Sequence, residues 1–155
     1  MRTAVVSVPT GETVLMAWEL LERAAARYLP VVHPDGRCAG LLERADVAVA
    51  CAAPAVRLSK RYVGDLLRGR RCVIVHHDDP VRRAVAVMDA NGCEALPVLG
   101  DRGRLAGLLA AADIVAALAG RPLGAGRPDE TPLPVPYPLV PGLPPLRDDR
   151  VTPVP

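Results

Sequence analysis

Hydrophobic side chains recur along the first third of the chain with spacings typical first of a strand and then of a helix. Four of them fall at i, i+3, i+4 and i+7 and would share one face of a helix: Val14, Ala17, Trp18 and Leu21. Short apolar runs flank this stretch, and a polar turn with Gly36 follows the second run, which indicates a β-hairpin. A closing helix is expected from about Arg44 to Ala52. The pattern predicts a β-α-β-β-α unit.

The same pattern occurs a second time, 67 residues further along, where residues 73–117 align with residues 6–50 without a gap. Most positions are identical between Gly36–Asp46 and Gly103–Asp113, including Gly, Arg and Asp. A unit of about 50 residues is too small to bury a stable core alone. We therefore expect one pseudo-symmetric α+β domain, in which the two sheets pack face to face and the helices lie outside.

Three features recur in both copies and in the same order: an apolar-Pro-Val step, a hairpin glycine and a Gly-to-Asp segment that leads from strand to helix. They are Leu29–Val31 and Leu96–Val98, Gly36 and Gly103, and Gly40–Asp46 and Gly107–Asp113. Residues 63–67 resemble the short lead-in that precedes a repeat. On these motifs, residues 4–120 resemble the cystathionine-beta-synthase (CBS) domain pair, or Bateman module. The expected boundaries are a domain at 1–120, with repeats at 4–52 and 63–120 and a linker at 53–62.

The resemblance also implies a function, because members of this family bind adenosine-containing ligands in clefts between the paired repeats. AMP, ADP, ATP or S-adenosylmethionine would be a regulatory ligand, with no obligatory cofactor. A homodimer and an effect on a protein partner in trans are implied as well. The aspartates that would hold ribose hydroxyls are Asp46 and Asp113. The other expected cleft residues are Val6, Val8, Leu29, Pro30, Arg44, Val73, Val75, Leu96, Pro97 and Ala110.

The chain departs from the family pattern where a Ser or Thr would help to hold phosphate at a helix N-terminus. Glu43 stands there in the first copy, and at ~5 Å and an effective dielectric near 20 it would repel each phosphate charge by about 3 kcal/mol. Arg44 would offset this repulsion only if its side chain turns toward the cleft. Ala110, in the second copy, removes one hydrogen bond worth about 1 kcal/mol. We expect the first cleft to exclude polyphosphates and the second to accept an adenosine nucleotide weakly.

Two alternatives stay open. A carboxylate in the first turn of a helix is stabilising without any ligand, so both aspartates could be purely structural. The chain would then be a degenerate CBS pair that serves as a dimerisation or docking scaffold. Catalysis is not expected, because Ser7 and Ser59 are the only serines and neither lies in a nucleophile motif.

Composition and charge limit the classes of partner that the chain is expected to bind. The net charge is +2, from 19 basic and 17 acidic residues, and only 3% of residues are aromatic, which argues against a nucleic-acid partner. No apolar stretch reaches membrane-spanning length, so we expect no membrane contact and a cytoplasmic location. The four cysteines, Cys38, Cys51, Cys72 and Cys93, show no C-x-x-C spacing, so no metal site is expected and they should be small, reduced core residues.

The composition changes at residue 121. Eleven of the chain's 17 prolines lie at or after residue 122, a density that forbids a helix or an interior strand. Residues 121–155 are therefore predicted to be a disordered, proline-rich tail. Within it, Pro132–Pro138 could dock in an aromatic-lined groove, although a plain flexible tail is the simpler interpretation.

Overall fold

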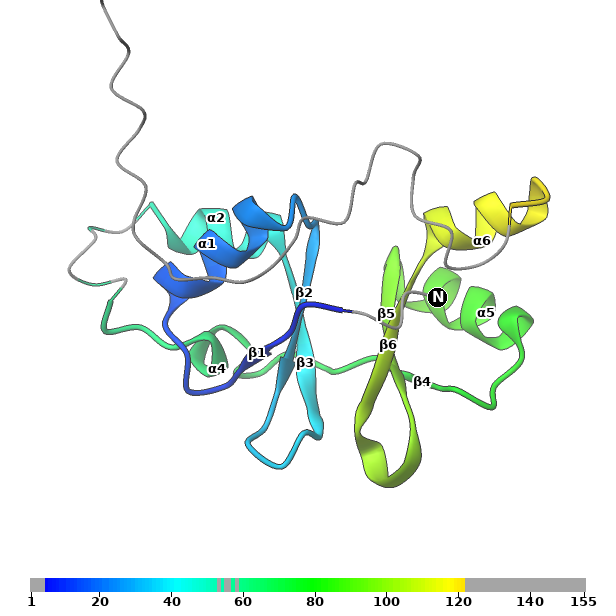
Figure 1. Cartoon of the computed structure of the whole chain (residues 1–155), viewed down its shortest axis with the longest axis horizontal. Coiled ribbons are helices and arrows are strands. Elements are labelled where there is room, and N and C mark those ends of the chain that lie inside the picture. The colour runs from blue at the N-terminus through cyan, green and yellow to red at the C-terminus, as the bar shows by residue number, and fades with distance from the viewer. Residues whose placement is uncertain (1–4, 53, 55–56, 58, 122–155) are drawn as a thin grey trace, which may run out of the picture. The chain divides into compact units, whose positions relative to one another are not determined.

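The structure is a computed structural model that describes residues 5–52, 54, 57 and 59–121. Two units follow one another along the chain (Figure 1). The first contains β1 (Val8–Pro9), α1 (Val14–Arg23), β2 (Tyr28–Val32), β3 (Cys38–Glu43) and α2 (Arg44–Ala50). The second contains β4 (Val75–His76), α5 (Val81–Asn91), β5 (Ala95–Leu99), the short 3₁₀ turn η1 (Asp101–Gly103), β6 (Leu105–Ala110) and α6 (Ala111–Leu118). The predicted order β-α-β-β-α, and with it the α+β class, is confirmed in both units.

Each unit forms a three-stranded sheet with the same strand order and the same register. β1 runs parallel to β2, which pairs antiparallel with β3, and β4, β5 and β6 repeat this arrangement. Leu29 lies opposite Leu42 and Leu96 opposite Leu109, so the register repeats at the offset of 67 residues found in the sequence. β1 and β4 are shorter than their apolar runs suggested, because only two residues of each pair with the neighbouring strand.

The apolar face of α1 forms the centre of the first core. Val14, Ala17 and Leu21 have no exposed surface. The helix begins after Thr13, whose hydroxyl accepts a hydrogen bond from the backbone N–H of Met16 at 3.2 Å. This contact satisfies one of the amides left unpaired at a helix start. α1 is therefore capped at its N-terminus by a side chain.

The second core repeats this arrangement with α5, which buries Ala84 and Met88 against β5 and β6. α5 begins differently from α1, because no side-chain hydrogen bond caps it. Pro80 occupies the N-cap position, while the carboxylate of Asp79 accepts a hydrogen bond from the N–H of His76 at 2.8 Å. Asp79 closes the turn before the helix because its side chain bonds back to the end of β4.

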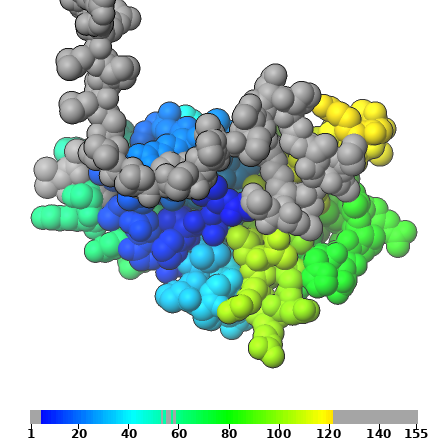
Figure 2. Space-filling view, viewed as in Figure 1, coloured from blue at the N-terminus to red at the C-terminus, as the bar shows by residue number. Residues whose placement is uncertain are grey.

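The two sheets face each other, with β3 in contact with β5, and the helices of each unit cover the outer sides (Figure 1). The hairpin tips lie side by side, as the light blue and yellow-green tips show in Figure 2. Arg37 and Arg104, which occupy equivalent positions, form a β-bridge there, and the N–H of Leu105 donates to the carbonyl of Gly36 at 3.3 Å. The predicted face-to-face packing of the two sheets is confirmed.

The segment between the two units packs on the first one. Its helix α4 (Val63–Leu66) inserts Val63, which has no exposed surface, into the first core. The N–H of Val63 donates to the carbonyl of Glu12 at 2.9 Å, and Leu67 lies so close to Gly40 that a Cβ there would come within 2.9 Å of it. The lead-in that we counted with residues 63–120 thus completes the core of the first repeat.

Two further predictions from the sequence concern the proline-rich tail and contact with a membrane. From residue 122 on, the proline-rich segment lies outside the described residues. Within the part of the chain that the structure describes, no helix is long and apolar enough to cross a membrane.

Because Val63 fills the first core from outside that repeat, Val63→Ala should lower the free energy of unfolding by about 2 kcal/mol. Urea denaturation of the full chain measures this change. Val49→Ala is the matched control, because Val49 on α2 is 77% exposed and should cost less than ~0.5 kcal/mol. Equal losses in the two variants would contradict the placement of α4.

Candidate functional site

A cavity of about 380 Å³ lies between the two repeats. Its wall combines the start of β2, the end of β3, the first turn of α2, the segment before β4 and the loop before β5. The lining residues are Arg27, Tyr28, Leu41, Glu43, Asp46, Arg71, Cys72, Val73, Gly92, Cys93, Glu94 and Ala95. Both repeats contribute, so the cavity exists only because they pack together.

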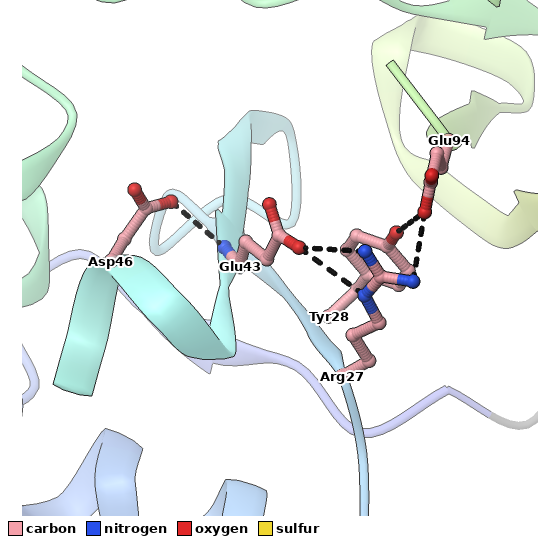
Figure 3. Close-up of polar contacts among 5 residues, drawn as sticks. All are labelled: Arg27, Tyr28, Glu43, Asp46 and Glu94. Carbon is pink, nitrogen blue, oxygen red and sulfur yellow. Dashed lines mark hydrogen bonds and ion pairs between the residues drawn. The ribbon is translucent and has the colours of Figure 1, made fainter.

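Asp46, one of the two predicted ribose ligands, lies at this cavity in the first turn of α2. Its Oδ2 accepts a hydrogen bond from the backbone N–H of Glu43 at 3.0 Å, which fixes the carboxylate at the helix start (Figure 3). Arg70 donates two further hydrogen bonds to the same carboxylate, at 2.7 and 2.9 Å. The Arg70 guanidinium lowers the pKa of Asp46 below its usual value, and the Glu43 amide lowers it further. A ribose would have to compete with Arg70 for these oxygens.

Glu43 forms an ion pair with Arg27, a residue that the sequence analysis did not single out. Arg27 donates from Nε and from a terminal nitrogen to Glu43 Oε1, at 3.2 and 3.1 Å (Figure 3). The other terminal nitrogen of Arg27 lies 2.8 Å from Glu94 of the second repeat, and Tyr28 donates to the same Glu94 oxygen at 3.4 Å. Arg27 therefore bridges carboxylates of both repeats across the cavity.

A signal for this bridge is present in the sequence. Residues 27 and 94 are separated by the repeat offset of 67 and so occupy equivalent positions. Equivalent residues that meet across a pseudo-two-fold axis would carry like charges if the repeats were identical. Arg and Glu at this position instead attract each other, which a comparison of the two copies could have revealed.

Arg44 does not turn toward the cavity, contrary to its predicted place in the cleft. Its guanidinium lies 5.3 Å from the ring centre of Trp18 and forms an ion pair with Glu22. It also donates weakly to the carbonyl oxygens of Leu21 and Ala26, at 3.4 and 3.5 Å. These partners all belong to α1 and the loop after it, so Arg44 fastens α1 to α2 and offsets no charge at Glu43.

The other predicted cleft residues fall into three groups. Val73 lines the cavity. Six others have buried side chains in the sheets, each no more than 3% exposed: Val8, Leu29, Pro30, Val75, Leu96 and Pro97. They are core residues of the two sheets. Val8 and Val75 belong to β1 and β4, and the other four to the apolar-Pro-Val steps of β2 and β5. Val6, which is 45% exposed, and Ala110 are not part of the cavity wall.

Asp113, the second predicted ribose ligand, occupies the same local position as Asp46. Its Oδ2 accepts a hydrogen bond from the N–H of Ala110 at 3.0 Å, at the start of α6. It does not line the cavity beside Asp46. The two aspartates are thus equivalent in local structure but lie in different surroundings.

Among the described residues, no group of three or more His, Cys, Asp or Glu side chains could hold a metal ion.

Comparison with known families agrees with this architecture. A sequence model of the CBS domain matches residues 1–53 and 63–120. The chain belongs to the CBS domain family. The curated relatives it matches are much longer: the homoserine O-acetyltransferase of Methanococcoides burtonii is 26% identical over 114 residues, which are 74% of this chain but 22% of the relative. The chain therefore spans about a fifth of that relative's length.

Solved structures of CBS domain pairs share the fold. CBSX2 in complex with AMP superposes with a TM-score of 0.66 at 23% identity, over 77% of this chain and 92% of that one. A CBS domain pair in complex with 5′-methylthioadenosine and S-adenosyl-L-methionine superposes with a TM-score of 0.62 at 22% identity, over 75% and 89%. At these identities the likeness establishes the fold of the CBS pair.

The Arg70–Asp46 pair gives a pH-dependent contribution to stability. Because the folded pKa of Asp46 is lowered, this contribution is fully present above the unfolded pKa near 3.9 and disappears as the pH falls through the folded value. Arg70→Gln should raise the pKa of Asp46, and an NMR titration of the Asp46 carboxylate measures this change. It should also cost up to about 1 kcal/mol of stability at pH 7, because both side chains are partly exposed.

The matched control is Arg68→Gln, which removes the more exposed ion pair with Asp65 on the same segment. This variant should leave the Asp46 pKa unchanged. An Asp46 pKa that does not respond to Arg70→Gln would contradict the bidentate pairing.

Proposed function

We propose that the chain is a regulatory CBS pair whose cavity beside Asp46 binds an adenosine-containing ligand. The observation that carries this proposal is the cavity itself, since about 380 Å³ falls within the range of small-molecule sites. Leu41, Val73 and Ala95 offer apolar surface for a base, and Asp46 offers a carboxylate for ribose hydroxyls. The related CBS pairs crystallised with AMP and with S-adenosylmethionine support the same ligand class.

The charges around the cavity favour adenosyl compounds without a phosphate chain. Three carboxylates, of Glu43, Asp46 and Glu94, line the cavity beside only two guanidiniums, of Arg27 and Arg71. Arg27 is already engaged by Glu43 and Glu94. Arg70 in turn is engaged by Asp46, so a triphosphate would have to compete with the carboxylates of the cavity for these arginines. Adenosine is neutral and the sulfonium of S-adenosylmethionine is positive, so neither requires an arginine as counter-charge. The proposal keeps the expectation that the first cleft disfavours polyphosphates, although the charge of Glu43 is paired with Arg27, which a phosphate would have to displace.

Ligand binding would act on the segment that joins the repeats. Arg70 and Arg71 lie between α4 and β4, and Arg70 occupies the Asp46 oxygens that a ribose would use. A ligand that displaces Arg70 changes the contacts of this segment and transmits its presence to the surface. In this proposal the chain needs no cofactor, catalyses no reaction, resides in the cytoplasm and acts on a protein partner in trans.

Thermal unfolding with adenosine, S-adenosylmethionine, AMP, ADP and ATP tests the ligand proposal. A ligand at about a hundred times its Kd stabilises by ~2.7 kcal/mol, which raises Tm by several degrees. We expect shifts with adenosine or S-adenosylmethionine to exceed the shift with ATP. Asp46→Ala should abolish them. Arg70→Ala should tighten adenosine binding by up to about 5-fold, because it removes a competitor worth at most ~1 kcal/mol.

Asp65→Ala is the matched control for Asp46→Ala. Asp65 also accepts a hydrogen bond from the amide at its helix start and pairs with an arginine of the same segment, but it does not line the cavity. Its loss should leave the ligand shifts intact. The absence of any shift in both wild type and Arg70→Ala would overturn the ligand proposal in favour of the scaffold.

A dimerisation scaffold is the second candidate, favoured by the exposed apolar side chains of α5 and α6. Val81 and Val85 of α5 are 46% and 44% exposed, and Val115 and Leu118 of α6 are 64% and 84% exposed. Apolar groups gathered on neighbouring helices are typical of an interaction surface. We propose that a second copy of the chain covers them, in keeping with the homodimer that the family resemblance implies.

Sedimentation equilibrium should then give twice the chain mass of 16.4 kDa. Leu118→Lys should weaken the dimer at least 10-fold, because a charge would be buried in the interface. Ala90→Lys is the control. Residue 90 is exposed and lies nine residues, or about two and a half turns, after Val81, so it is on the opposite side of α5. A wild-type monomer at all concentrations, or equal effects of both substitutions, would contradict this interface.

A further inference from the structure

Two carboxylates from different repeats share one guanidinium at the cavity. Arg27 donates to Glu43 Oε1 at 3.2 and 3.1 Å, and another of its nitrogens lies 2.8 Å from Glu94 Oε2 (Figure 3). Glu94 also accepts a hydrogen bond from the hydroxyl of Tyr28, at 3.4 Å. All four residues line the cavity, so a ligand bound there would meet these charges directly.

The group has a surplus of negative charge. One positive charge, on Arg27, lies between two negative charges, on Glu43 and Glu94, and the hydroxyl of Tyr28 is neutral near pH 7. One of the negative charges is therefore left uncompensated. Because Arg27 belongs to the first repeat and Glu94 to the second, this charge lies where the repeats meet.

The remaining charges of the cavity wall do not remove this surplus. Asp46 is paired with Arg70 through two hydrogen bonds, so that carboxylate is already balanced. Arg71 lines the cavity as well, but within the described part of the chain its guanidinium is not the ion-pair partner of Glu43 or Glu94. Arg71 would favour a negative group of a ligand, whereas the two glutamates favour a positive one.

The three charged side chains are accessible to a ligand. Those of Arg27, Glu43 and Glu94 are 59%, 41% and 62% exposed. Ion pairs this exposed contribute little to stability, so their rearrangement around a ligand costs little. A small positive group can therefore share the two carboxylates with the guanidinium.

We propose that Glu43 and Glu94 form a subsite for the positively charged group of an adenosyl ligand, and that Arg27 sets the strength of this subsite. The inference rests on the proposed function and narrows it from adenosyl compounds in general to cationic ones. Because Glu43 stands where the family pattern has a Ser or Thr, the subsite is a property of this chain. The sulfonium of S-adenosylmethionine donates no hydrogen bond, so charge alone would attract it to the carboxylates.

The test compares S-adenosylmethionine with S-adenosylhomocysteine, which lacks the sulfonium methyl group and its positive charge. Isothermal titration calorimetry of the full chain measures both Kd values, and their ratio reports the charge preference. The wild type should bind S-adenosylmethionine more tightly. Arg27→Gln removes the compensating charge and should raise this preference about 5-fold, whereas Glu94→Gln should lower it by a similar factor. Arg27→Lys keeps the charge and should keep the wild-type ratio.

The ratio separates charge from packing, because a loss of stability would weaken the binding of both compounds. Arg82→Gln is the matched control, since Arg82 is exposed on α5 and does not line the cavity. This variant should leave the ratio unchanged. Raising the NaCl concentration from about 50 to about 500 mM should lower the wild-type ratio, because salt screens exposed charges.

The results that would overturn the inference are distinct from those that would overturn the proposed function. Equal Kd values of the two compounds for the wild type, or one ratio shared by wild type, Arg27→Gln and Glu94→Gln, would overturn the cationic subsite alone. A wild type that binds adenosine but neither of these compounds would do the same. A wild type that binds none of the three would overturn both.

Discussion

All five residues of β5 are buried, although neighbouring residues of a strand point to opposite faces of its sheet. Both faces of the second sheet must therefore be covered, and its own helices can cover only one. The other face is covered by the sheet of the first repeat, through the contact of β3 with β5 (Figure 1). The need to bury a second apolar face holds the two repeats together. The cavity and the charged residues that line it lie where the repeats meet.

Packing about a pseudo-two-fold axis brings equivalent positions into contact. At one end of the interface Arg27 meets Glu94, and at the other Arg37 forms a β-bridge with Arg104. Identical repeats would place like charges together at both ends. The exchange of one basic for one acidic residue at position 27 or 94 relieves this repulsion where the cavity lies. The ion pair across the cavity is thus a consequence of both the symmetry of the fold and the difference between the two copies at this position.

The segment between the repeats is held to the first one by contacts of different chemical kinds. Val63 fills its core, and the N–H of the same residue donates to the carbonyl of Glu12. Arg70 adds an ion pair with Asp46. A ligand at Asp46 would therefore act on a stretch of chain that is also part of the first core.

The sequence by itself determined the repeat, the order of its elements and the family, because these depend on spacings that both copies preserve. Asp46 and Val73, two residues that the sequence predicted for a ligand cleft, line the cavity between the repeats. Only the tertiary structure decided that Pro30 and Pro97 are core residues, that Arg44 turns to Trp18, and that Arg27 and Arg70 bind the acidic groups of the cavity. The physical reason is that an arginine side chain is long enough to reach several carboxylates, and its choice depends on which residues of distant segments the packed sheets bring within reach.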